Sequence, residues 1–119
     1  MIDIEIRPAF GMTPGRLVAT GHAMTAEPGK DLVCCAVTTM IGALQSNLDR
    51  CYGVTYKAES KEGYGKLIWG RGRKGKGGAL NRANTIAGFV YNTLKDLEKE
   101  HPKALRVCWQ PAAPREEKV

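Results

Sequence analysis

Residues 31–48 read DLVCCAVTTMIGALQSNL, and this stretch carries the clearest structural pattern in the chain. Its apolar residues recur at steps of three and four, the spacing of one face of an α-helix. They are Val33, Val37, Met40, Ile41, Leu44 and Leu48. Asp31 stands directly before them, where a helix N-cap belongs. The stretch therefore predicts a helix over 32–48 with one apolar face.

A second helix is predicted further along the chain, over 80–100. Its apolar positions are Ala83, Ile86, Ala87, Val90, Leu94 and Leu97. His101-Pro102 marks its end, because the residue before a proline resists the helical conformation.

Shorter segments alternate apolar and polar residues, as half-buried strands do. They lie at 2–7, 17–20, 52–56, 67–69 and 105–109. We expect the first two to pair as a hairpin, and Glu62-Gly63 to form the turn between the third and the fourth. The order β-β-α-β-β-α-β predicts an α+β fold, in which a largely antiparallel sheet is covered on one face by two helices.

Length and composition fit one globular domain. The chain has 119 residues, of which 43% are hydrophobic and 25% charged. We expect a single domain over 1–109 and a flexible C-terminal tail over 110–119. No apolar run approaches the roughly 20 residues of a membrane-spanning helix, and the alternating N-terminus lacks the features of a signal peptide. The expectation is a cytoplasmic protein without a membrane partner.

The four cysteines are expected to be free thiols in a reducing compartment. They fall at positions 34, 35, 51 and 108, and no two have the C-x-x-C spacing of a zinc site. With only two histidines in the chain, we expect no metal and no cofactor. On the predicted helix Cys35 points away from the apolar face, whereas Cys51 and Cys108 are expected to fill gaps in the core.

The net charge of +6 is concentrated in the glycine-rich segment 70–78. Its cations are Arg71, Arg73, Lys74 and Lys76. Such a loop suits RNA, so a non-enzymatic ribosome- or RNA-binding module is one alternative function. The segment also matches the G-x-x-x-x-G-K pattern of a phosphate-binding loop. However, Gly77 replaces the Ser or Thr that would hold magnesium, which disfavours nucleotide binding.

His22 and Cys34 form the candidate catalytic pair. His22 closes a predicted strand and Cys34 opens a predicted helix, so both are expected at the same end of the domain. A nucleophile and its base need that proximity. Cys34 would also lie near the positive end of the helix dipole, which favours the thiolate. Backbone N–H groups of the first helical turn could stabilise an oxyanion.

Two sequence blocks resemble a known family, the ribosomal-processing cysteine proteases. They are Gly21-His22-Ala23 and the stretch GKDLVCCAVT at 29–38. The family pattern is roughly G-H-A, a short loop, then G-x-D-I-V-C-A-A-V-S. The stretch LKDLE at 94–98, followed by His101-Pro102-Lys103, is also similar to the end of that family's second helix. The resemblance covers about residues 2–107.

This resemblance implies a cysteine endopeptidase with His22 and Cys34 as its catalytic dyad. Gly21, Asp31 and Thr38 would support activity. The substrate would be the N-terminal extension of a large-subunit ribosomal protein, cleaved after an aromatic residue. The enzyme would be a homodimer. Related phage enzymes process capsid proteins, so capsid or scaffold precursors are an alternative substrate class.

The resemblance also implies that the loop 23–30 moves to admit substrate. The loop residues assigned to the substrate are Ala23, Met24, Thr25, Gly29 and Lys30. Met24-Thr25 stands where the family usually has Gly-Tyr, and Thr38 keeps the hydroxyl of the usual serine. The segment 70–78 is longer and more basic than the family pattern, and its cations are the candidate RNA contacts.

Overall fold

The protein is described by a computed structural model that covers residues 1–21, 31–73 and 78–111. Within these residues it has five strands and two helices in the predicted order. They are β1 (Ile2–Arg7), β2 (Gly15–Thr20), α1 (Leu32–Asp49), β3 (Val54–Lys61), β4 (Tyr64–Arg71), α2 (Ala79–Glu100) and β5 (Leu105–Trp109). The α+β class is confirmed, and β3 and β4 are longer than the alternation of the sequence indicated.

All five strands form one sheet in the order β3-β4-β2-β1-β5. The expected hairpin is present, because β1 pairs antiparallel with β2, and β3 pairs antiparallel with β4. β2 and β4 are also antiparallel, whereas β1 and β5 are parallel. The sheet is therefore largely antiparallel, with one parallel edge strand.

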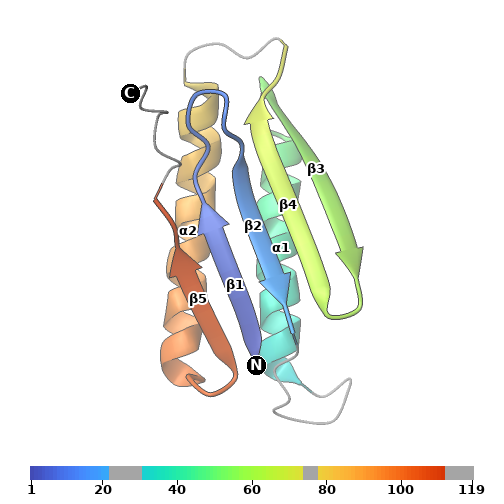
Figure 1. The fold of residues 1–119 in the computed structure, drawn as a ribbon, viewed down its shortest axis with the longest axis vertical. Helices are drawn as coiled ribbons and strands as arrows, with labels where there is room; N and C mark the ends of the chain where they lie inside the picture. The colour runs from blue at the N-terminus through green and yellow to red at the C-terminus, as the bar shows by residue number, and fades with distance from the viewer. Residues whose placement is uncertain (22–30, 74–77, 112–119) are drawn as a thin grey trace, which may run out of the picture.

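Both helices cover the same face of this sheet and lie side by side (Figure 1). α2 packs mainly against β5 and α1 mainly against β3, the two edge strands of the sheet. α1 places Val33, Val37, Leu44 and Leu48 in the core, all of them residues of the predicted apolar face. The two-layer arrangement buries Trp69 of β4 beneath the helices, at 1% exposure.

α1, taken over its whole length, is unusually apolar for a helix that covers a sheet. Its 18 residues have a mean hydropathy of 1.2, so by length and composition alone α1 could cross a membrane. Its inner face is nevertheless part of the core of the domain. Core helices meet this composition test as well, so the expectation of no membrane partner stays a prediction.

The expected burial of Cys108 and Cys51 and the predicted C-terminal tail can be compared with the structure. Cys108 was expected in the core, but it is exposed, because the alternation of β5 turns Leu105 and Val107 inward and Cys108 outward. Cys51 is half-buried. The predicted tail 110–119 lies mostly outside the described residues, although the Gln110 N–H still donates to the Ile6 carbonyl (2.7 Å).

Candidate active site

Cys34 is the third residue of α1, and its position is fixed by the N-cap. The Asp31 carboxylate accepts hydrogen bonds from the N–H groups of Val33 (3.0 Å) and Cys34 (3.1 Å). The cap predicted from the sequence is therefore present. Cys34 is half-buried and packs against the core, whereas Cys35 is exposed. The structure thus separates the two adjacent thiols as the helical spacing indicated.

The cap also uses the backbone donors that an oxyanion would need. Besides the N–H groups of Val33 and Cys34, that of Cys35 is engaged, because it donates to the Asp31 carbonyl (3.1 Å). The expectation that first-turn N–H groups stabilise an oxyanion is therefore not met by these three groups in this conformation. The physical reason is that a side-chain cap and an oxyanion compete for the same donors.

Gly21 directly follows the last residue of β2 and precedes His22 in the sequence. Its φ of +93° lies in the left-handed region, and its N–H donates to the Gly63 carbonyl (3.0 Å). A Cβ at this position would lie 2.2 Å from the Met1 carbonyl oxygen. Both the backbone conformation and the available space therefore require glycine here.

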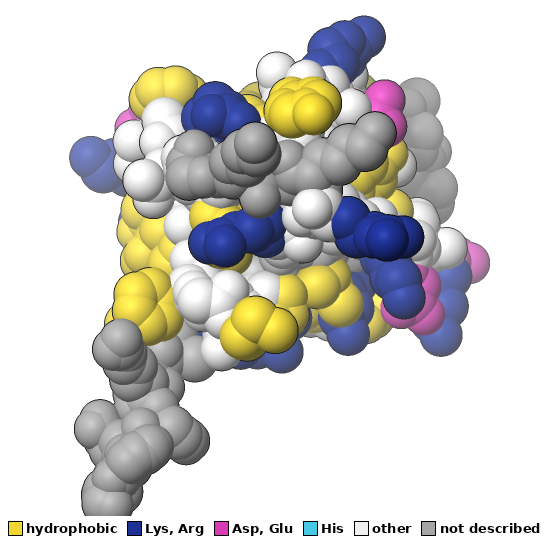
Figure 2. Space-filling model, turned by 90° about the horizontal axis from the view of Figure 1, so that it is seen from above, with side chains coloured by type: hydrophobic (Ala, Val, Ile, Leu, Met, Phe, Trp, Pro, Cys, Tyr) yellow, Lys and Arg dark blue, Asp and Glu magenta, His cyan; other side chains and the backbone are white. Residues whose placement is uncertain are grey.

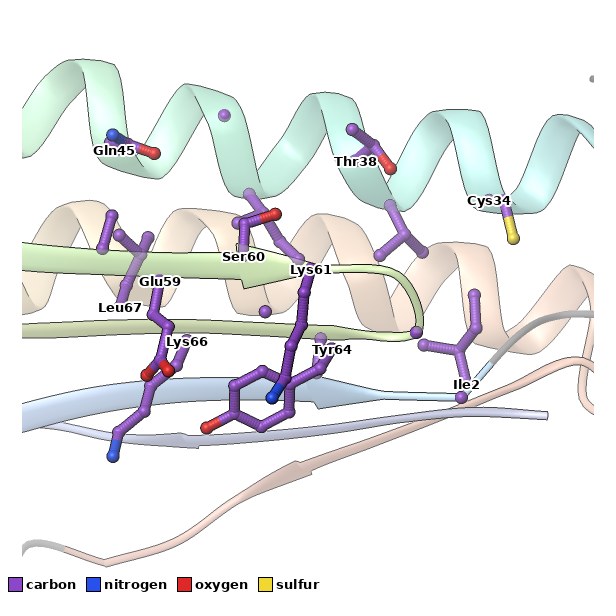
Figure 3. A pocket seen from close by; sticks show the side chains of 18 residues that line it. Ile2, Cys34, Thr38, Gln45, Glu59, Ser60, Lys61, Tyr64, Lys66 and Leu67 are labelled. Atoms are coloured by element: carbon purple, nitrogen blue, oxygen red, sulfur yellow. The ribbon is translucent and has the colours of Figure 1, made fainter.

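Gly21 and Cys34 line the same cavity, which has a volume of about 450 Å³. The cavity lies between α1 and the β3–β4 hairpin (Figure 3). Thr38 also lines it, one helical turn after Cys34. Three of the residues singled out in the sequence, Gly21, Cys34 and Thr38, are thus brought together at one cavity.

Several residues that line the cavity were not assigned to the site from the sequence. The main ones are Ile41, Gly42 and Gln45 on α1, Ser60 on β3 and Gly65 on β4. The helical residues had a signal that could have found them. They recur at steps of three and four after Cys34 and Thr38, so they continue the same side of the helix. The strand residues had none, because they reach the cavity only through sheet pairing.

Several residues of the sequence-based site lie outside the described part of the chain. They are His22, Ala23, Met24, Thr25, Gly29, Lys30, Lys74 and Lys76. The pairing of His22 with Cys34 therefore stays a prediction, as do the roles of the loop 23–30. Within residues 1–21, 31–73 and 78–111, no three His, Cys, Asp or Glu side chains group as metal ligands would.

Arg71 and Arg73 lie at the opposite end of the molecule from Cys34. β4 ends at Arg71, beside the start of β3, and both are close to the C-terminal end of α1 (Figure 1). Four other arginines lie at the element ends that meet there, namely Arg7, Arg16, Arg50 and Arg82. Figure 2 shows cationic side chains on this face of the molecule. From Cys34 to Arg50 the distance along α1 is roughly 24 Å.

Comparison with known proteins agrees with the fold. The family model for cysteine protease Prp matches residues 1–106. The essential ribosomal processing protease Prp of Staphylococcus aureus, solved with a covalently linked product peptide, superposes with a TM-score of 0.71 at 17% identity. That match covers 92% of this chain and 100% of the other. The same protease with a substrate peptide gives a TM-score of 0.67 at 16% identity and the same coverage.

A protein of Streptococcus mutans is similar as well, with a TM-score of 0.66 and 19% identity over 93% of this chain and 95% of its own. A search of curated proteins found no match. Because the family model spans nearly the whole chain, this chain belongs to the Prp family of cysteine proteases. It is accordingly a peptide-bond hydrolase that uses a cysteine nucleophile.

Proposed function

We propose that this enzyme removes a short N-terminal extension from a large-subunit ribosomal protein, with Cys34 as nucleophile and His22 as base. The observation that carries the assignment of the nucleophile and the base is the cavity described above. It is lined by Cys34 and by Gly21, the residue next to His22. The S. aureus relatives are ribosomal processing proteases solved with peptides, which supports a peptide occupant here.

The proposed reaction has two halves. His22 takes the proton of the Cys34 thiol, and the thiolate attacks the scissile carbonyl carbon. The C–N bond then breaks, the leaving amine takes the proton from His22, and the substrate acyl group stays on sulfur as a thioester. In the second half His22 takes a proton from water, and the resulting hydroxide attacks the thioester. Cleavage of the C–S bond releases the new carboxyl terminus and restores the thiol.

The test is the intact mass of a ribosomal-protein precursor peptide after incubation with the enzyme. We expect one cut by the wild type and by Cys35→Ala, the matched control, because Cys35 is the exposed neighbour. Cys34→Ala should give no cut, and His22→Ala should lower the rate by at least about a hundredfold. Equal cutting by Cys34→Ala would overturn the mechanism.

The same assay separates the two substrate classes. If the wild type leaves the ribosomal precursor intact but cuts capsid or scaffold precursors, the substrate assignment is wrong and the phage-type alternative replaces it. In both cases the contrast between Cys34→Ala and Cys35→Ala still tests the nucleophile.

We also propose that the arginine-rich end contacts RNA, as the charge of segment 70–78 suggests. Arg71 and Arg73 are exposed there, far from Cys34, so RNA and peptide could bind together. The measurement is a salt titration of RNA binding. Replacing both arginines with glutamine should lower the slope of log K against log salt by about 0.7 per lost phosphate contact. Lys103→Gln, at the other end of the molecule, is the control. An unchanged slope in the arginine variant would refute RNA contact.

We further propose a cytoplasmic homodimer, in line with the family resemblance. Two large apolar side chains exposed on the helices are compatible with self-association: Leu32 on α1 is 80% exposed and Phe89 on α2 is 66% exposed. Light scattering should give about twice the chain mass of 13.0 kDa. A mass equal to one chain across the micromolar range would contradict the dimer.

A further inference from the structure

A second cavity, with a volume of about 510 Å³, lies between the two helices at the arginine-rich end of the molecule. Residues from the end of α1 and the turn after it line one side, and residues near the start of α2 line the other. These two helix ends meet at the top of Figure 1. Cys34 lies near the opposite end of α1, so this cavity is separate from the proposed active site. Its volume is in the range of sites that hold small organic ligands.

The second cavity is lined by two guanidinium groups and, within the described part of the chain, by no carboxylate. Arg50 and Arg82 are both exposed, and each is anchored by a backbone carbonyl. Arg50 donates to the Ser46 carbonyl (3.2 Å), and Arg82 donates to the Tyr52 carbonyl (3.0 Å). Each of these bonds uses one nitrogen of a group that carries several N–H donors. The remaining donors suit a phosphate, which a guanidinium group binds in a bidentate manner.

Tyr52 adds an aromatic ring to the cavity. This residue is 72% exposed, although the turn that carries it is fixed. Its carbonyl accepts from Arg82, and the carbonyl of the next residue, Gly53, accepts from the Gly72 N–H (2.8 Å). An exposed ring on an anchored turn suits stacking, because little conformational freedom is lost when a flat partner binds.

The remaining lining combines an apolar side chain with amide groups. Ile86 is half-buried and packs against the core. Asn47 on α1 and Asn81 on α2 are exposed and carry their side-chain amides at the cavity. An amide can both donate to and accept from the edge of a nucleobase. The guanidinium groups, the ring and the amides therefore match the phosphate, the base face and the base edge of a nucleotide.

The surroundings of the cavity favour a nucleotide that is part of a strand. Arg71 and Arg73 are exposed at the same end of the molecule, outside the cavity, where they can reach further phosphates. The base must be unpaired, because in a duplex its faces are stacked and its pairing edge is occupied. An acidic peptide would satisfy the guanidinium groups but would give the ring of Tyr52 no flat partner.

We propose that this cavity receives one unpaired nucleotide of an RNA strand, with its base stacked on Tyr52 and its phosphate bound by Arg50 and Arg82. Arg71 and Arg73 bind phosphates of neighbouring nucleotides. This inference rests on the proposed RNA contact of the arginine-rich end and adds to it a site for the base. It does not depend on the cleavage reaction.

The experiment compares two labelled RNAs by fluorescence anisotropy at physiological salt. One is a single-stranded oligouridylate of about 12 nucleotides, and the other is a blunt RNA duplex of the same length. Tyr52→Ala should lower the affinity for the single strand by about fivefold or more, because one stacked base is lost. It should change the affinity for the duplex by less than about twofold.

Two further variants control for the ring and for its position. Tyr52→Phe should keep the wild-type affinities, because the ring and not the hydroxyl stacks on the base. Tyr64→Ala, at the start of β4 and so at the opposite end of the molecule, should keep them as well. Urea unfolding of all three variants shows that they are folded.

Replacement of Arg50 and Arg82 by glutamine tests the phosphate contact. The slope of log K against log salt for the single strand should fall by about 0.7, the value for one phosphate contact. An unchanged slope would refute the assignment of the phosphate to these two residues.

The proposal fails if Tyr52→Ala weakens both RNAs equally or neither of them. If the variant of Arg71 and Arg73 still loses salt slope in that case, the RNA contact stands and only the nucleotide pocket is refuted. If the wild type binds neither RNA, the RNA contact itself is refuted, and with it a strand as the occupant.

Two other ligands identify a different occupant. Uridine monophosphate that binds as tightly as the strand, with the same dependence on Tyr52, would replace the strand by a free nucleotide. A polyglutamate peptide that is weakened by the glutamine variant of Arg50 and Arg82, but not by Tyr52→Ala, would assign the cavity to an acidic peptide and overturn the proposal.

Discussion

The carboxylate of Asp31 is the residue on which the geometry of Cys34 depends most directly. It holds two backbone N–H groups at the start of α1, one of them that of Cys34 itself. Without this cap the first turn would expose unpaired donors and fray. The nucleophile proposed here would then lose its fixed direction toward the cavity.

We expect Asp31→Ala to lower the free energy of unfolding by about 1 kcal/mol, the usual effect of removing an N-cap. Asp31→Asn should retain most of the stability, because an asparagine side-chain oxygen accepts the same bonds. Urea unfolding of the two variants in parallel is the measurement. Equal losses in both variants would show that the charge, and not the cap, stabilises this end of the helix.

At the scale of elements, the exposed edge of β5 is protected by α2. β5 pairs with β1 on one side only. On its other side the Val107 N–H donates to the Glu98 carboxylate (3.1 Å), and Lys95 donates to the Val107 carbonyl (3.2 Å). Lys95 and Glu98 also form an ion pair at 2.6 Å. Side chains thus take the place of a further strand, which keeps the edge from pairing with other chains.

This bridge makes stability depend on pH. The hydrogen bond from Lys95 is the main reason that the pKa of Glu98 is lowered from 4.5, and the Val107 N–H adds to the effect. A lowered pKa in the folded state means that the stabilisation is complete above pH 4.5 and is lost as pH falls through the folded pKa. Glu98→Gln removes this dependence.

We expect Glu98→Gln to be less stable than the wild type by at most about 1 kcal/mol at pH 7. The difference should be smaller at pH 3 than at pH 7, because the Glu98 carboxyl takes up a proton as pH falls through its lowered folded pKa. Urea unfolding at both values gives the answer, with Glu100→Gln on the exposed end of α2 as control. A difference that is the same at pH 3 and pH 7 would contradict the assignment.

At the scale of the whole molecule, Asn84 joins three parts of the chain that are distant in sequence. From α2 its side chain accepts from the Ala9 N–H (2.8 Å) and from the Trp69 indole N–H (3.2 Å). It also donates to the Ala9 carbonyl (2.9 Å). The segment after β1, the centre of β4 and the first half of α2 are thereby held together.

Asn84→Ala should lower the free energy of unfolding by about 2 to 4 kcal/mol. It leaves the indole N–H of the buried Trp69 and both backbone groups of Ala9 without this partner. Asn81→Ala, on the exposed side of the same helix, should cost less than about 0.5 kcal/mol. Chemical denaturation of both variants tests the expectation, which fails if the two losses are equal.

The sequence by itself determined where the helices and strands lie, and which residue caps the helix that carries Cys34. Periodicity near 3.6 or 2 residues is a local property, so the helices, the strands and the Asp31 cap could be predicted without the fold. The outward direction of Cys35 follows from the same helical spacing. The motif around Cys34 placed the chain in its family.

Only the tertiary structure decided which elements that are distant in the sequence are neighbours in the fold. The parallel pairing of β5 with β1, the alignment of Ala19, Gly65 and Ser60 across β2, β4 and β3, and the cavity below α1 arise from contacts between residues far apart in the chain. Local spacing contains no information on those contacts.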